Sequence, residues 1–246
     1  MKQENPSFRI GILGGMGPMA GVFLQQLIIE ATPAEKDQDH IQMVCFTNPK
    51  IPDRTTSLKE DGGKAFVDAV VESMNVLQKT GVDLAVMACN TAYTRFPDIQ
   101  KSASVPMLNL FEITYTHLKK KYGKPVAIGI LATDGLIQSG YCQAMFTESG
   151  YSCIVPDDEH QKNVMKAIYT IKQGTNDVVH SYLKEAVDHL KMRGAKVVLL
   201  ACTELSLYFD QLQGQGVIIE DPMRICATYL VSLSKSRTLR QMSYVH

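Results

Sequence analysis

The run Leu84-Ala85-Val86-Met87-Ala88-Cys89-Asn90-Thr91-Ala92 joins an apolar segment to a cysteine and then to small polar residues. Such a run predicts a buried parallel strand with the thiol of Cys89 at its carboxyl end. In open α/β sheets, ligands bind outside the carboxyl ends of the strands. One cysteine at such a place means little by itself, because free cysteine is among the residue types most often buried.

The same pattern occurs a second time, at Lys196-Val197-Val198-Leu199-Leu200-Ala201-Cys202-Thr203-Glu204-Leu205. In addition, the letters Ile-Gly-Ile-Leu at residues 10–13 recur at residues 128–131. The offset is 118 residues for this tetrapeptide and 113 for the two cysteines. Two ordered matches at similar offsets predict a duplicated α/β unit, whose pseudo-twofold axis lets the cysteines face each other across a cleft.

We therefore expect an α/β fold of two pseudo-symmetric subdomains, each a parallel sheet flanked by helices, with the active site in the cleft between them. The first subdomain is expected to comprise residues 1–106 and 216–246, because the last helix follows a strand that returns from the second half. The second subdomain is expected to comprise residues 107–215.

The composition is that of an ordinary globular protein, with 45% hydrophobic and 20% charged residues among 246. A formal net charge of zero gives no indication of a nucleic-acid or membrane partner. No apolar run reaches transmembrane length, and residues 1–6 lack the apolar core of a signal peptide, so we expect a cytoplasmic protein. The six cysteines form no CxxC pair, which leaves a metal site without support and predicts free thiols.

A glycine-rich turn, Gly14-Gly15-Met16-Gly17-Pro18, separates a strand at 8–13 from a helix that runs to about residue 31. Its pattern differs from the GxGxxG of dinucleotide-binding proteins, and no acidic residue ends the next strand, at 41–46. Two interpretations remain. The glycines allow strand and helix to pack closely, or the turn binds a carboxylate at the helix N-terminus.

Residues 47–63 are predicted to form a long loop stiffened by Pro49 and Pro52. Within it, Arg54 is a candidate clamp for a carboxylate, because a guanidinium can pair with two oxygens at once. The alternative is a solvated arginine paired with Asp53. Lys172 lies in the last turn of a predicted helix. A cation there compensates the helix dipole, so this structural role is the alternative to a role in binding.

Periodicity and turn signals predict the other elements. His180 and His189 lie at or beyond the margin of an apolar helix face, so we expect both to be solvated. A capping box is expected at Asp158 and Gln161. The predicted helices are 64–80, 111–120, 137–148, 158–173, 176–193, a segment from Cys202 to about 211, and 221–233; the predicted strands are 105–108, 125–131, 151–155 and 217–219.

Two facing thiols suit one reaction especially well, the removal of a proton from one face of a carbon and its return to the other. A thiolate acts as the base and the opposite thiol as the acid. A free cysteine has a pKa of about 8.5, and a helix N-terminus lowers it. Both Cys89 and Cys202 precede predicted helix starts. No metal motif, nucleotide loop or lysine signal of the pyridoxal-phosphate type accompanies them.

At these residues the sequence resembles the aspartate/glutamate racemase family, most of all its PLP-independent aspartate racemases. The resemblance covers nearly the whole chain apart from its two ends. It rests on five separated motifs in the family's order: Gly14-Gly15-Met16-Gly17-Pro18; Asn48-Pro49 with Ile51-Pro52-Asp53-Arg54-Thr55; Cys89-Asn90-Thr91-Ala92; Ile168-Tyr169 with Lys172; and Cys202-Thr203-Glu204.

The resemblance implies a racemase that interconverts L- and D-aspartate without cofactor or metal, and a homodimer. It implies that Cys89 and Cys202 are the catalytic acid/bases. The residues implied to bind substrate are Arg54 and Lys172 at the side-chain carboxylate, Asn90, Thr91 and Thr203 at the α-amino and α-carboxylate groups, and Met16 in the glycine turn.

Three departures bear on the substrate. Glu204 replaces the histidine typical of glutamate racemases, which favours aspartate. Gly21 replaces a common threonine, and Leu136 replaces a hydroxyl residue found in several relatives, so glutamate or another acidic amino acid remains an alternative. The same fold family includes hydantoin racemases, maleate isomerases and decarboxylases with one cysteine. Outside these enzymes, a non-catalytic protein that binds an acidic amino acid, or an α/β protein with two structural cysteines, would also carry these features.

Overall fold

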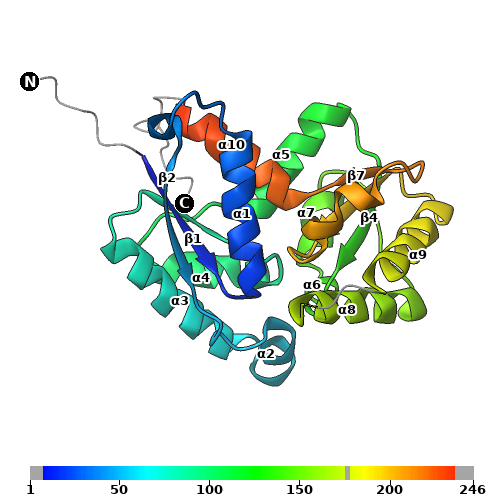
Figure 1. The fold of residues 1–246 in the computed structure, drawn as a ribbon. Helices are drawn as coiled ribbons and strands as arrows, with labels where there is room; N and C mark the ends of the chain where they lie inside the picture. Colours follow the sequence, from blue (N-terminus) through cyan, green and yellow to red (C-terminus); the bar gives the residue numbers. More distant parts are fainter. Residues whose placement is uncertain (1–7, 175–177, 236–246) are drawn as a thin grey trace, which may run out of the picture.

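The apolar runs of the chain form two parallel sheets, as the duplicated pattern predicted (Figure 1). In this computed structural model, the structure describes residues 8–174 and 178–235. The first sheet has the order β2-β1-β3 and the second β5-β4-β6-β7, so the two Ile-Gly-Ile-Leu strands occupy equivalent places. The strands are β1 (Arg9–Gly14), β2 (Gln42–Thr47), β3 (Leu84–Met87), β4 (Ala127–Ala132), β5 (Ser152–Ile154), β6 (Val197–Ala201) and β7 (Ile218–Glu220).

Helices cover both sheets, and Figure 1 shows the blue-to-cyan first half beside the green-to-yellow second half. The α-helices are α1 (Pro18–Ala31), α2 (Arg54–Asp61), α3 (Lys64–Lys79), α4 (Phe96–Ser102), α5 (Leu110–Tyr122), α6 (Asp134–Ser139), α7 (Tyr141–Thr147), α8 (Asp158–Lys172), α9 (Val179–Met192) and α10 (Pro222–Lys235). Short 3-10 helices are η1 (Asp37–Asp39), η2 (Thr91–Arg95), η3 (Leu205–Tyr208) and η4 (Asp210–Leu212). Within the described ranges, no helix is long and apolar enough to cross a bilayer.

The last helix returns to the first half of the molecule. α10 packs against α1 and α5, while β7, which precedes it, pairs with β6 in the second sheet. The border expected at residue 216 stays a prediction, and the pairing of β7 favours a border after Glu220.

Several local predictions were wrong. The expected loop at 47–63 contains α2, because the Asp53 side chain accepts a hydrogen bond from the Thr56 N–H and caps a helix there. The expected helix at 137–148 is two helices, since Gly140 adopts a left-handed φ of 67° between them. The N-cap of α8 is Asp157 in place of the capping box at Asp158.

Two further differences concern the sheet edges and the segment after Cys202. The strand expected at 105–108 is a single bridge between Ala85 and Met107, on the side of β3 that corresponds to β7 on β6. Pro106 lacks an N–H and cannot extend this pairing. The helix expected after Cys202 consists of the two 3-10 turns η3 and η4. The helix predicted at 176–193 begins among residues outside the described ranges, and α9 is its described part.

The glycine turn after β1 is crowded, which supports the close-packing interpretation. Gly15 has a φ of 104°, and a Cβ there would lie 2.3 Å from the carbonyl of Asn48. A Cβ on Gly21 of α1 would lie 3.0 Å from the Cα of Gly14. Gly14 and Gly21 thus let α1 approach β1 closely. A threonine at position 21, the residue expected there from the resemblance, would not fit without a shift of the helix.

Replacement of Gly15 should therefore destabilise the protein more than a positive φ alone explains. We expect Gly15→Ala to lower the free energy of unfolding by about 3 kcal/mol, from strain and overpacking together. Gly123→Ala is the control, because Gly123 has a φ of 69° but open space around it, and it should cost about 1 kcal/mol. Urea unfolding of both variants measures the difference, and equal losses would contradict the clash.

Candidate active site

The carboxyl ends of β3 and β6 bring Cys89 and Cys202 to one cavity. The two residues are 4% and 3% exposed, and each follows its strand in an equivalent position of the two sheets. The cavity is narrow, since its free space is about 10 Å³, close to what one water molecule needs. Its lining includes every site residue named from the sequence: Met16, Arg54, Cys89, Asn90, Thr91, Lys172, Cys202 and Thr203.

Six other residues line the cavity and were not named as site residues: Asp53, Thr55, Thr133, Ile168, Tyr169 and Glu204. Five of them stand inside the motifs quoted above, so the sequence resemblance already pointed to their segments. Thr133 follows β4 at the place where the glycine turn follows β1, and the internal repeat could have identified it. Its hydroxyl and that of Thr91 share a hydrogen bond of 2.8 Å across the two halves.

Arg54 is a buried residue, 6% exposed, in the first turn of α2. Its Nη1 donates to the carbonyls of Pro52 (2.9 Å) and Ile51 (3.3 Å), and its Nη2 donates to the carbonyl of Met16 (2.9 Å). The alternative of a solvated arginine paired with Asp53 is therefore wrong. The Nε of Arg54 is buried and has no hydrogen-bond partner in the part of the chain that the structure describes, so this donor is unused.

Asn90 presents a second set of unused polar atoms. Both its Oδ1 and its Nδ2 are buried and have no partner among the described residues. A buried amide without hydrogen bonds costs on the order of 1–3 kcal/mol, so such groups are typical of sites that a polar ligand completes.

Lys172, in the last turn of α8, remains charged within the cavity. Burial works against its charge, but the acidic groups of Glu204 and Cys202 outweigh burial and raise the pKa of Lys172 above its ordinary value. Burial by itself would raise the pKa of the Asp53 carboxyl. The hydrogen bond from the N–H of Thr56 and the charges of Arg54 and Lys172 outweigh burial and hold this pKa below its ordinary value.

The carboxylate of Glu204 binds both Cys202 and the glycine turn in the opposite half of the molecule. The Sγ of Cys202 donates to Oε2 of Glu204 at 3.1 Å, and Oε1 of Glu204 accepts from the backbone N–H of Gly17 at 2.9 Å. Thr203 also contacts Glu204 Oε2, at 3.3 Å. The anion held at the glycine turn of α1 is thus a side chain of the protein itself.

The thiol of Cys202 is protonated at neutral pH in this arrangement. Burial raises its pKa well above the ordinary value, the charge of Glu204 raises it further, and the charge of Lys172 partly opposes both. The lowering expected from a helix N-terminus is wrong for Cys202. Only the short 3-10 turn η3 follows it, whereas a buried carboxylate contacts the sulfur directly.

Known proteins share this fold and these motifs. Residues 13–230 match the family described as Asp/Glu/Hydantoin racemase. The chain is 30% identical over 218 residues to the broad specificity amino-acid racemase RacX of Bacillus subtilis (strain 168), which spans 86% of this chain and 92% of that protein. A glutamate racemase of Shewanella woodyi is 24% identical over 208 residues, or 82% and 74% of the two chains.

Among solved structures, the Picrophilus torridus aspartate racemase superposes with a TM-score of 0.80 and 27% identity, covering 92% of this chain and 94% of that chain. The matched residues 13–230 include both cysteine-tipped strands, the glycine turn and both cavity cations. The chain belongs to the Asp/Glu/hydantoin racemase family of amino-acid racemases.

Proposed function

We propose that this protein racemises an acidic amino acid, aspartate in particular, by proton transfer between the α-carbon and two thiols. The observation that carries the proposal is that Cys89 and Cys202, from equivalent strand ends of the two repeated halves, line the same cavity. Two cations, Arg54 and Lys172, line the same cavity. We further propose, as the resemblance implies, a cytoplasmic homodimer that needs neither PLP nor a metal for this reaction.

In the proposed reaction, one thiolate removes the α-proton and leaves a carbanion that the α-carboxylate helps to delocalise. The opposite thiol then donates its own proton to the other face, so the product has inverted configuration and the two sulfurs have exchanged protonation states. The resemblance assigns L-aspartate to Cys202 and D-aspartate to Cys89. A single fixed base could not reach both faces of the carbon.

The unused polar atoms of the cavity have partners in this scheme. The free Nε of Arg54 and the ammonium of Lys172 neutralise the side-chain carboxylate, because buried anions require paired cations. The amide of Asn90, with Thr91 and Thr203, takes the α-amino and α-carboxylate groups. Met16 contributes its carbonyl to orient the guanidinium of Arg54.

Glu204 is proposed to accept the proton of Cys202 before the reaction in the L-to-D direction. Its Oε2 already accepts a hydrogen bond from that thiol, and Lys172 stabilises the thiolate that forms. The proton moves from sulfur to carboxylate and the S–H bond electrons stay on sulfur, so the charge of the pair is unchanged.

A broader substrate range is the second candidate, favoured by the 30% identity to a broad specificity racemase. A panel of L-amino acids, each incubated alone and analysed for its D-form, separates the two. Turnover confined to aspartate and glutamate supports the acidic clamp, and comparable turnover of neutral or basic amino acids contradicts it. A binding protein without catalysis would form no D-amino acid from any of them.

The thiol pair is tested with L-aspartate and D-aspartate in heavy water. We expect Cys89→Ser and Cys202→Ser each to lose racemisation by at least about 10³-fold, since serine is a far weaker base than a thiolate. Cys89→Ser should still exchange the α-hydrogen of the L-form, and Cys202→Ser that of the D-form. Cys45→Ser, at an exposed thiol of β2, is the control and should keep full activity. Full racemisation by either active-site variant would exclude the mechanism.

The clamp is tested with Arg54→Lys, which keeps the charge but loses the guanidinium fork. Alanine is unsuitable, because Arg54 is buried and bonded to three carbonyls, so its loss would also destabilise the fold. We expect kcat/KM for aspartate to fall about 100-fold in Arg54→Lys. Arg9→Lys is the matched control, since Arg9 also donates to a backbone carbonyl, that of Thr80, but at the other end of β1. Equal kcat/KM in the two variants would contradict the clamp.

The electrostatic control of Cys202 is tested by alkylation. Glu204→Gln removes a charge that raises the thiol pKa, so alkylation of Cys202 should begin at lower pH than in the wild type. Lys172→Met removes the opposing charge and should shift the alkylation curve to higher pH. Mass spectrometry of the peptide with Cys202 gives the curves, and Glu148→Gln at an exposed carboxylate is the control. If Glu204→Gln also racemises at the wild-type rate, Glu204 is not the proton acceptor.

A further inference from the structure

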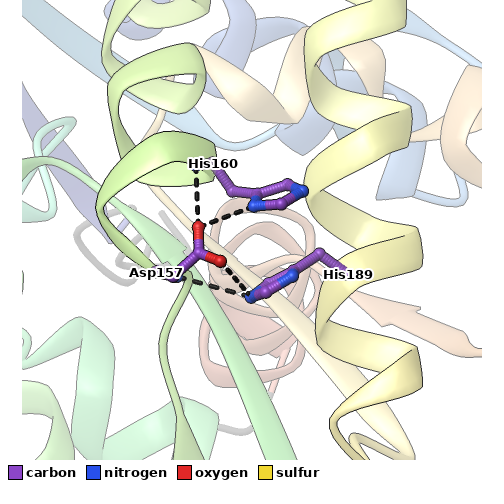
Figure 2. A group of neighbouring side chains, drawn as sticks. All are labelled: Asp157, His160 and His189. Atoms are coloured by element: carbon purple, nitrogen blue, oxygen red, sulfur yellow. Dashed lines mark hydrogen bonds and ion pairs between the residues drawn. The ribbon is translucent and has the colours of Figure 1, made fainter.

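Asp157, His160 and His189 converge outside the cavity, where α8 begins beside the end of α9 (Figure 2). Asp157 is the N-cap of α8, His160 lies in its first turn, and His189 lies in the last turn of α9. The expectation of a solvated His189 is wrong, because its side chain is only 12% exposed and its ring stacks on that of His160 at 3.9 Å. His180 is exposed, as predicted.

The nitrogen and oxygen atoms of the three side chains face one another. Oδ1 of Asp157 lies 2.6 Å from Nδ1 of His160, and its Oδ2 lies 3.6 Å from Nε2 of His189. One ligand atom from each residue fits within 4.8 Å of the others. The backbone N–H of Asp157 donates to Nε2 of His189 at 3.4 Å, so this nitrogen carries a lone pair and an ion bound to it would replace that hydrogen bond.

We propose that this cluster binds one divalent transition-metal ion of the zinc class through Asp157, His160 and His189. Two imidazoles and a carboxylate suit zinc, cobalt or nickel, whereas magnesium and calcium prefer oxygen ligands alone. Bonds of about 2.0–2.2 Å in a tetrahedral site separate neighbouring ligand atoms by about 3.3 Å. The observed 2.6 and 3.6 Å lie on either side of that value. The two rings are stacked, so one imidazole must turn out of the stack before both lone pairs can meet at the ion.

The local charges favour a cation. Three carboxylates, of Asp157, Asp158 and Glu159, stand at the start of α8. They outnumber Arg193, the basic side chain that faces His189 and donates to the carbonyl of Val155 at 2.7 Å. The positive end of the helix dipole opposes the ion as well, but it is worth less than a full charge. Asp157 is half exposed, so water can complete the coordination shell.

An ion at this place would join the first turn of α8 to α9. α8 carries Ile168, Tyr169 and Lys172 into the active-site cavity towards its opposite end, about 15 to 21 Å from its first residue by helix rise. The ion would therefore stabilise the helix pair and take no part in the chemistry. The proposal does not depend on the substrate proposed above.

The experiment titrates Co²⁺ into the full chain in a Cys89→Ser, Cys202→Ser background, which removes the thiol pair as competing ligands. We expect one Co²⁺ per chain, with visible d–d absorption and no thiolate-to-cobalt charge-transfer band, and displacement by Zn²⁺. His160→Gln, His189→Gln and Asp157→Asn should each weaken binding by about tenfold or more. His180→Gln, on the same helix α9, should bind as the background protein does.

Thermal unfolding gives a second readout. Zn²⁺ should raise the Tm of the background protein and of His180→Gln, and the shift should disappear in the three ligand variants. Asp157→Asn is the decisive variant, because asparagine is as good an N-cap as aspartate and leaves the helix start intact. Equal metal affinity in the background and the three variants, or no binding of Co²⁺ and Zn²⁺ at all, would overturn the proposal and leave the cluster as a hydrogen-bonded helix cap.

Discussion

The carboxylate of Glu204 connects the two halves of the cavity. One oxygen accepts a hydrogen bond from the thiol of Cys202 in the second half, and the other accepts one from the N–H of Gly17 in the first. The residue before Gly17 is Met16, whose carbonyl holds the guanidinium of Arg54. A continuous path of hydrogen bonds thus runs from a thiol, through the glycine turn, to a cavity cation. Loss of the turn geometry would displace all three groups together.

This path also determines which cavity charges remain for a ligand. The carboxylate of Glu204 is occupied by the Cys202 thiol and the Gly17 N–H, and that of Asp53 by the N–H of Thr56 at the start of α2. Arg54 keeps an Nε that has no hydrogen-bond partner within residues 8–174 and 178–235. Lys172 makes no ion pair within 4 Å among the described residues. The acids of the site are therefore engaged by the protein, while its cations keep unused capacity, which is the balance that a ligand with an additional carboxylate would satisfy.

The sequence predicted those features that depend on local pattern. The two cysteine-tipped strands and the repeated Ile-Gly-Ile-Leu follow from periodicity and self-similarity, and the paired sheets confirm them. Features that depend on contacts between distant residues were beyond reach. Gly17 and Glu204 are 187 residues apart, and nothing local indicates that an N–H at a turn meets that carboxylate. The same holds for His160 and His189, which lie on different helices. The helix at Arg54 was missed for another reason, because two prolines obscured the capping signal of Asp53.

The high pKa of the Cys202 thiol has a chemical consequence for the proposed reaction. The α-proton of an amino acid is far less acidic than an ordinary thiol, so a thiolate stabilised strongly by its surroundings would be too weak a base to remove it. Burial and the neighbouring Glu204 make the thiolate of Cys202 more basic, at the cost of making it rare. A cation nearby reduces that cost and lowers the basicity by the same free energy, while a proton acceptor in direct contact with the sulfur adds a route by which the thiolate forms. Glu204 and Lys172 stand in those two places, so the surroundings of Cys202 combine a strong base with a route to its formation.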